Sequence, residues 1–163
     1  MQNDGLLLRH LQDKRDEEHI HLIQVRTDML WFCSAMQDLV LQIQMWLQGS
    51  GVTFFSSAIL HSDPSIRLWP NSQPTYYTVS KACLKKQDRM AMLLPVAVYG
   101  ISGTRGHAEL ILTIPGDVPA RKKFMFCLSR NSSQWIIREE HQWFSGGVLL
   151  NRATFLAAIA ALA

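Results

Sequence analysis

Residues 107–115 read HAELILTIP, and this short stretch decides the fold class. Four apolar side chains between Ala108 and Ile114 fall on one face of an extended chain. Glu109 and Thr113 fall on the other face. A period of two residues is typical of a strand with one buried face, so we expect a β-strand here.

Further strand patterns surround this stretch. Residues 123–130 alternate in the same way, and residues 134–143 continue after a turn as a partner strand. Short strands are expected at residues 96–101 and 148–150. Because consecutive strands joined by short turns usually pair with each other, the chain predicts an antiparallel sheet of three to four strands.

Helices are expected on both sides of this sheet. Residues 75–93 lack Gly and Pro and have apolar residues at helical spacing, which predicts an amphipathic helix that Pro95 stops. Asn151 suits the N-cap of an Ala-rich C-terminal helix over residues 152–162. The predicted fold class is therefore α+β, with a helix, an antiparallel three- to four-stranded sheet and a C-terminal helix after an N-terminal arm.

The N-terminal part of the chain is expected to be helical. Between residues 16 and 48 there is no Gly or Pro, and apolar residues recur at intervals of three and four. A shorter pattern of the same kind covers residues 5–15, which indicates one long helix or two helices in line. We expect a helical arm over residues 1–60, a Pro- and Ser-rich linker over residues 61–75, and an α+β domain over residues 76–163.

Charge is spread unevenly along the chain. The net charge is +3, from 16 Lys and Arg against 13 Asp and Glu, and Asp38 is the only charged residue from position 29 to position 62. A segment with so little charge indicates a surface that a partner covers. We take four apolar or aromatic residues of this helix as interface candidates: Trp31, Phe32, Met36 and Trp46.

A short basic run of Arg121, Lys122 and Lys123 is a second interface candidate. It could contact phosphate, lipid headgroups or an acidic partner, but a charged turn that keeps a strand edge soluble is the favoured interpretation. The basic excess is too small to indicate nucleic acid, which usually requires clustered Lys and Arg with stacking aromatics. We therefore expect no nucleic-acid partner.

Residues 39–60 carry no charge and approach the length needed to cross a bilayer. Two interpretations remain. The segment is either a weak membrane-embedded stretch shielded by partner proteins, or a buried helix to about Gln48, a turn and a strand over residues 52–60. The second is favoured, because several Gln residues and the triplet Gly49-Ser50-Gly51 interrupt the apolar run. A secretory signal is not expected, since acidic residues interrupt the first 20 positions.

Few side chains are candidates for catalysis or metal binding. His107 and His141 could work with Glu139 or Glu140 as acid and base, but solvated strand faces are the favoured interpretation. A second group, Glu17, Glu18, His19 and His21, has weak metal-ligand spacing. The cysteines, Cys33, Cys83 and Cys127, lie far apart and are expected as buried free thiols. We expect no catalytic, cofactor-binding or metal site, no small-molecule substrate, and no enzyme activity.

The segment over residues 76–150 resembles a known family. It has a helix led by a Tyr-Tyr pair with ACLKK at residues 82–86, a break at LPVAV (residues 94–98), the strand AELILTIPG (residues 108–116) and a hairpin with Trp135 in its second arm. In these features it resembles the soluble domain of the mitochondrial cytochrome c oxidase assembly factor family. That fold is shared with a regulatory subunit of the inner-membrane presequence translocase.

The resemblance implies a non-catalytic module at the mitochondrial inner membrane, on the side of the intermembrane space. It would be an accessory subunit or assembly factor of a respiratory complex, with protein subunits as partners and some contact with the membrane surface. One alternative is a soluble intracellular α+β adaptor or chaperone that acts as a dimer through its helices. Another is a cone-shaped α+β domain that binds a small ligand, with His107 or His141 in its pocket.

Overall fold

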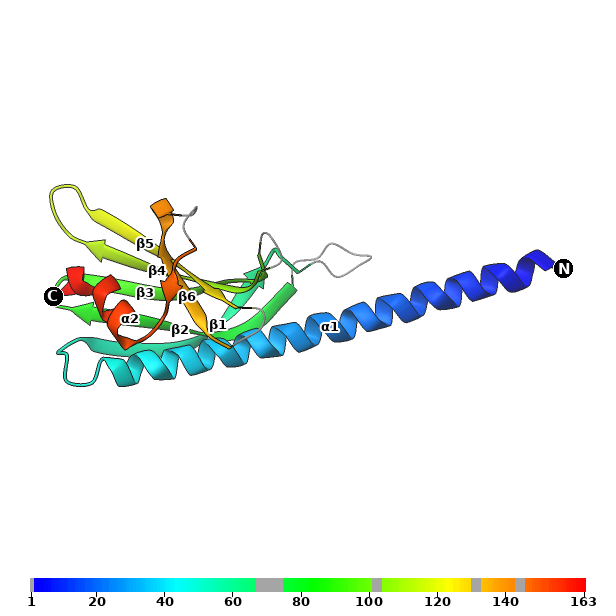
Figure 1. Ribbon diagram of the computed structural model, residues 1–163, viewed down its shortest axis with the longest axis horizontal. Helices are drawn as coiled ribbons and strands as arrows, with labels where there is room; N and C mark the ends of the chain where they lie inside the picture. The colour runs from blue at the N-terminus through cyan, green and yellow to red at the C-terminus, as the bar shows by residue number, and fades with distance from the viewer. Residues whose placement is uncertain (1, 67–74, 101–103, 130–132, 143–145) are drawn as a thin grey trace.

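The computed structural model describes residues 2–66, 75–100, 104–129, 133–142 and 146–163. The chain forms one long helix, a seven-stranded sheet and a short C-terminal helix, in that order (Figure 1). The elements are α1 (Gln2–Trp46), β1 (Thr53–Asp63), β2 (Thr75–Lys86), β3 (Arg89–Tyr99), β4 (Arg105–Ile114), β5 (Ala120–Leu128), β6 (Trp135–Glu139), β7 (Val148–Leu149) and α2 (Arg152–Ala158), with short 3-10 turns at Glu140–Gln142 and Ala160–Leu162.

All seven strands form one antiparallel meander in the order β1 to β7. The α+β class is confirmed, but the expected three to four strands are too few. The expected helix over residues 75–93 is wrong, because this segment forms β2 and β3. Gln87, with φ of 56°, lies in the tight turn between them. In β2 the buried residues include Tyr77, Val79, Ala82 and Leu84, a pattern that favours a strand even though the wider apolar spacing also fits a helix.

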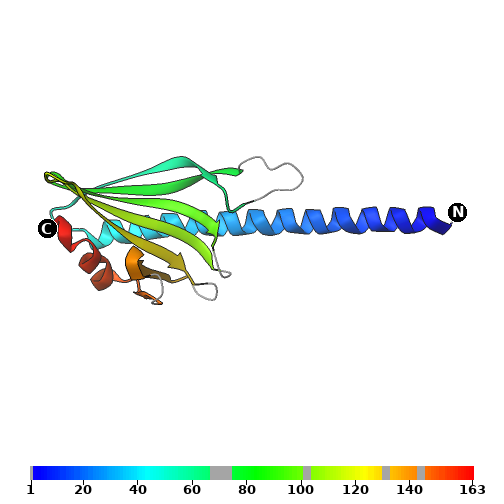
Figure 2. The same cartoon turned by 90° about the horizontal axis from the view of Figure 1, so that it is seen from above.

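Helix α1 is continuous, so the alternative of two helices in line does not apply. Its C-terminal half packs across the sheet, whereas its N-terminal half extends far beyond the sheet (Figures 1 and 2). The buried apolar residues begin at Val25 and continue to Leu47 at intervals of mostly three and four. They lie on one side of the helix and join the side chains of β2 to β6 in a single core.

The uncharged segment over residues 39–60 is divided between a helix and a strand. Helix α1 ends at Trp46, Gly49 and Gly51 turn the chain with φ of 75° and 79°, and β1 then pairs with β2 along its whole length. The favoured interpretation of this segment is therefore confirmed. Within the part of the chain that the structure describes, no helix combines the length and the apolar character needed to cross a membrane. Residues 67–74 of the expected linker lie outside the described residues.

The sheet opens between β2 and β3, and side chains bridge the opening. The two strands pair only near their turn, from Ala82 to Lys86 on β2. Beyond that point, Asp63 on β1 accepts hydrogen bonds from the backbone N–H of Val98 (2.9 Å) and from the Tyr77 hydroxyl (2.6 Å). His61 donates from Nε2 to the carbonyl oxygen of Val96 (2.8 Å). These bonds satisfy backbone groups of β3 that the separation of β2 leaves without a strand partner.

Helix α1 is fixed at the same opening by a buried carboxylate. Asp28 is 4% exposed and accepts hydrogen bonds from the Tyr99 hydroxyl (2.6 Å) and from Arg105 Nη1 (3.1 Å). One helical turn further along, Phe32 packs edge-to-face on Tyr77 with ring centroids 6.3 Å apart. The position of α1 on the sheet therefore depends on polar contacts as well as on apolar packing.

The C-terminal helix closes the other end of the core. The Asn151 side chain accepts a hydrogen bond from the backbone N–H of Thr154 (2.9 Å), and the Thr154 hydroxyl in turn accepts from the backbone N–H of Asn151 (2.8 Å). This reciprocal capping confirms the predicted N-cap. Phe155 of α2 is fully buried and packs on Trp46 of α1, with ring centroids 5.6 Å apart.

Candidate interaction surfaces

Helix α1 carries a second apolar stripe on the side that faces away from the sheet. We call this set the outer stripe: Ile20, Ile23, Leu30, Leu41 and Met45. Their side chains are 66%, 52%, 72%, 52% and 68% exposed. The spacings between them, of three, four, seven or eleven residues, place all five on one side of a helix. An apolar stripe of this length in water is unfavourable and indicates an interaction surface.

The outer stripe is also poor in charge. Between Thr27 and Gln48 the helix and its end have two acidic residues and no basic ones. One of them, Asp28, is buried against the sheet, so Asp38 is the only charged side chain exposed there. Small polar residues, Thr27 and Ser34, lie between the large apolar ones and would allow close approach of another helix.

Two of the four interface candidates on this helix are wrong. Phe32 and Met36 are 0% exposed and lie on the opposite side of α1, inside the core against the sheet. Their apolar surface is already covered by the chain itself, so no partner can reach it. Trp31 and Trp46 are half-buried and pack at the border of the core.

The basic run lies near the start of β5, where the strand pairs with β4 but not with β6, because the pairing with β6 begins at Phe124. This position agrees with the favoured interpretation of a charged run at a strand edge. Two of its three charges are paired across the sheet. Lys122 Nζ lies 3.1 Å from Glu139 Oε1, and Lys123 Nζ lies 2.8 Å from Glu109 Oε2. The hydrogen bond to Glu109 is the main reason that the pKa of Lys123 is raised. Arg121 is exposed, and the run as a whole offers little unpaired positive charge.

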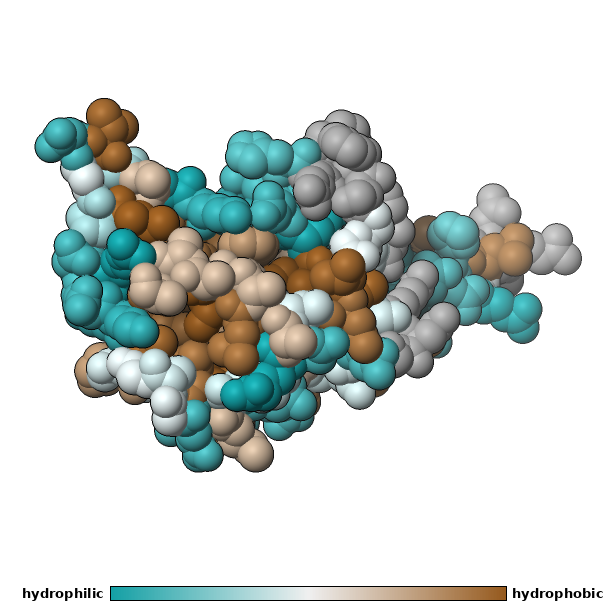
Figure 3. All heavy atoms as spheres, turned by 60° about the vertical axis from the view of Figure 1, so that its left-hand side comes forward, coloured by the Kyte–Doolittle hydropathy of each residue, from teal (hydrophilic) through white to brown (hydrophobic). Residues whose placement is uncertain are grey.

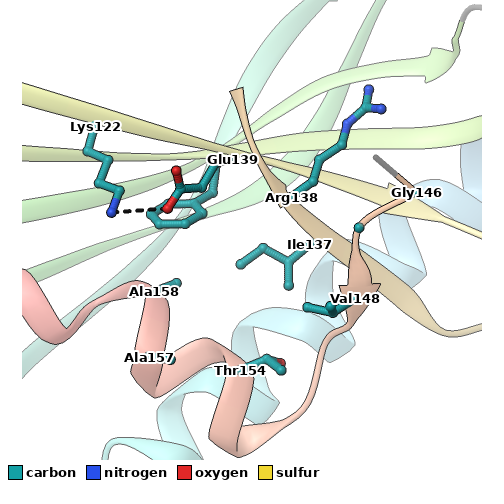
Figure 4. A pocket seen from close by; sticks show the side chains of 11 residues that line it. Lys122, Ile137, Arg138, Glu139, Gly146, Val148, Thr154, Ala157 and Ala158 are labelled. Atoms are coloured by element: carbon teal, nitrogen blue, oxygen red, sulfur yellow. Dashed lines mark ion pairs between the residues drawn. The ribbon is translucent and has the colours of Figure 1, made fainter. Parts of the chain in front are cut away.

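A cleft of about 380 Å³ lies between α2 and the last three strands. Seen from the end of the molecule that holds α2, hydrophobic side chains form the floor of a hollow with hydrophilic ones around it (Figure 3). In Figure 4, Ile137 and Val148 lie opposite Ala157 and Ala158, the Lys122–Glu139 ion pair spans one side, and Arg138 points away. The alternative hypothesis of a ligand pocket with His107 or His141 does not correspond to this cleft, because neither residue lines it.

The histidine candidates do not form an acid–base pair with the glutamates. His107 is half-buried, and its Nε2 lies 2.9 Å from the Thr104 hydroxyl. Burial lowers the pKa of His107, and burial also raises the pKa of Cys127, its register neighbour on β5. A thiol with a raised pKa stays protonated at neutral pH and is a poor nucleophile. His141 is exposed in the 3-10 turn after β6.

The acidic and histidine residues with weak metal-ligand spacing, Glu17, Glu18, His19 and His21, lie on the exposed part of α1. On a helix, Glu17 and His21 share a face, whereas His19 points to another side. In the part of the chain that the structure describes, no group of three or more His, Cys, Asp or Glu side chains could hold a metal ion. Cys33, Cys83 and Cys127 are free thiols of intermediate burial.

The outer stripe was missed by the sequence prediction, although its signal is present. The apolar spacing of α1 looks like that of one face, but it contains two series of residues. One series, including Val25, Phe32 and Met36, faces the sheet, and the other, including Ile23 and Leu30, faces outward. Assigning each residue its angle around the helix separates the two series. No family model matches this chain, and no curated protein or solved structure shows significant similarity to it.

Proposed function

We propose that this protein is a non-catalytic protein-interaction module whose outer stripe binds a helix of a partner subunit. The observation that carries the proposal is the exposure of five large apolar side chains, from Ile20 to Met45, along one side of α1. Burying such side chains contributes about 25 cal/mol for each Å² of apolar surface removed from water. A partner helix suits this surface because the stripe is narrow, and from Thr27 to Gln48 Asp38 is the only exposed charged side chain.

The fold supports a docking role for this helix. The opposite side of α1 is held by the core from Val25 onward and by the contacts of Asp28, so the outer stripe from Leu30 to Met45 is presented on a rigid support. A pre-ordered binding surface loses less conformational entropy on association than a flexible one. The stripe therefore offers both the apolar area and the rigidity that helix docking requires.

The wider role as an accessory subunit or assembly factor of a mitochondrial respiratory complex rests on the family resemblance alone. One of the features behind that resemblance was a helix led by a Tyr-Tyr pair, and Tyr76 and Tyr77 lie on strand β2 instead. The respiratory complex, the mitochondrial location and the contact with a membrane surface therefore stay predictions. The helix-docking proposal does not depend on them, because it is argued from the outer stripe.

The proposal is tested by comparing variants of the full chain in the native host on native gels. We expect the unmodified chain to co-migrate with a larger assembly, and Leu30→Gln/Leu41→Gln to abolish the co-migration. Leu60→Gln is the matched control, because Leu60 is 70% exposed but lies on β1, away from the stripe. A photo-crosslinking residue at position 30 should attach to a helical segment of the partner, and the same residue at position 60 should not.

Two outcomes would contradict the proposal. The unmodified chain could migrate as a lone monomer in extracts that preserve assemblies. Alternatively, the double variant could co-migrate as well as the Leu60→Gln control does, which would mean that the outer stripe is not the binding surface.

A further inference from the structure

The free N-terminal part of α1 carries a feature that partner docking through the outer stripe does not use. Residues 4–21 are exposed throughout, and none of the other helices and strands that the structure describes lies against them. Three leucines lie close together on one side: Leu7, Leu8 and Leu11 are 60%, 67% and 48% exposed. Three exposed leucines on one side of a helix segment form an apolar surface in contact with water.

Two of the leucines, Leu8 and Leu11, lie in a row with a charged residue at each end, and we call this row of four residues the seam. Asp4, Leu8, Leu11 and Arg15 follow each other at intervals of four, three and four residues, which is the spacing of the a and d positions in a coiled coil. The acidic residue is at one end, the basic residue is at the other, and both are exposed. No ion pair of Asp4 or Arg15 is found among the described residues.

This order of residues is complementary to itself when two copies run in opposite directions. If Leu8 of one copy lies opposite Leu11 of the second, the same register places Asp4 opposite Arg15, because the two pairs have a common midpoint. The two-fold axis repeats each contact, so the seam gains two leucine pairs and two ion pairs. In a parallel arrangement Asp4 would face Asp4 and Arg15 would face Arg15, and both contacts would be repulsive.

The register also fits the rest of the molecule. It uses only residues 4–15, whereas the core begins to cover α1 at Val25. The two folded bodies would therefore lie at opposite ends of the paired helices, without contact between their sheets. We propose that the free arm of α1 pairs antiparallel with the same arm of a second copy through Asp4, Leu8, Leu11 and Arg15. The paired segment is short, so the dimer forms reversibly and depends on concentration.

The leucine part of the seam is tested by sedimentation of the full chain over a concentration series. Leu8→Gln should lower the association constant by about tenfold or more, because each dimer loses two buried leucines. Leu6→Gln is the matched control, since Leu6 is 66% exposed but points away from the seam. It should change the association constant by less than about twofold. A wild-type chain that stays monomeric, or equal effects of the two variants, would overturn the proposal.

The order of charges along the seam is tested by exchanging the charges of Asp4 and Arg15. Arg15→Asp should weaken association by about fivefold, because both ion pairs become repulsive contacts. Asp4→Arg/Arg15→Asp should restore association, since the exchanged charges face each other again. In a parallel dimer the double exchange would restore nothing. Far-UV circular dichroism of each variant shows whether the helix itself has been kept.

Mixing gives a second measurement that does not need the double variant. The single variants Asp4→Arg and Arg15→Asp should each associate poorly alone and associate with each other when mixed. Failure of the mixture to associate would contradict the charge pairing. The result is separate from the test of the outer stripe, because Leu30→Gln/Leu41→Gln leaves the arm unchanged and should not alter self-association.

Discussion

The two halves of α1 have the same conformation and a similar apolar spacing, but very different surroundings. From Val25 to Leu47 the apolar residues of the inner face are almost completely buried by the sheet. From Leu6 to Leu11 the leucines are 48% to 67% exposed, and no described element covers them. The difference shows that apolar periodicity identifies the sides of a helix, whereas strands far along the sequence decide which side is covered.

The comparison also explains why the arm is helical at all. A short helix on its own is only marginally stable in water, because forming its first turn is unfavourable in free energy, whereas adding further residues is not. The buried half provides the started helix, and the arm extends it without interruption. Gly5 is the weakest position of the arm, since glycine is a poor helix former.

The largest expected effect comes from removing a buried side chain of the inner face. Phe32→Ala should lower the free energy of unfolding by about 3–5 kcal/mol, because it removes a fully buried ring and leaves a cavity. Leu11→Ala, in the arm, should change it by less than about 0.5 kcal/mol. Urea unfolding followed by tryptophan fluorescence measures both. Similar losses in the two variants would mean that the arm is part of the cooperative core.

A smaller loss of folding stability is expected from a substitution at the junction between the two halves of α1. Asp28→Ala should lower the free energy of unfolding by about 2–4 kcal/mol, because the Tyr99 hydroxyl and Arg105 lose their buried acceptor. Asp16 is the matched residue in the arm, where it accepts a hydrogen bond from Gln12 at the surface (3.2 Å). Asp16→Ala should be nearly neutral in the same unfolding measurement. A neutral Asp28→Ala would show that packing alone holds the helix on the sheet.

Alkaline pH should weaken the same junction. Burial, and then the hydrogen bond to Asp28, raise the pKa of Tyr99 above its usual value. The folded state therefore keeps a proton that the unfolded state loses above about pH 10. Stability from this group is complete below about pH 10 and falls as the pH rises further. Urea unfolding at about pH 8 and about pH 11 measures the free energy of unfolding at each pH. Between these two pH values it should fall less for Tyr99→Phe than for the wild type. Equal falls would contradict the role of Tyr99.

The helix and the later strands could be predicted from the sequence, and the middle of the sheet could not. Alternation of apolar and polar residues, interrupted at Ile111, marked β4, and Asn151 marked the start of α2. Residues 75–93 were misassigned because apolar residues at Val79, Ala82 and Leu93 fit a helix as well as two strands joined at Gln87. A turn without Gly or Pro left no local signal to decide between them.

The candidate surfaces were predictable only in part for a related reason. A charge-poor stretch indicated an interface on α1, but burial against the sheet removed Phe32 and Met36 from it. The side of the helix that faces the sheet is held by the buried apolar residues and by Asp28, whose partners come from β3 and β4. Such long-range contacts have no signature in a single sequence.

The smallest expected effect concerns the arm alone. Gly5→Ala has no neighbouring atom in its way, and alanine favours a helix over glycine by about 1 kcal/mol. If the arm is independent of the core, this change should raise the helical circular dichroism signal and leave the urea midpoint unchanged. If the arms pair, it should also strengthen self-association, because the free arm then loses less entropy on pairing. A shifted midpoint would show that the arm and the body unfold as one unit, and the contrast between the two halves of α1 would be one of exposure only.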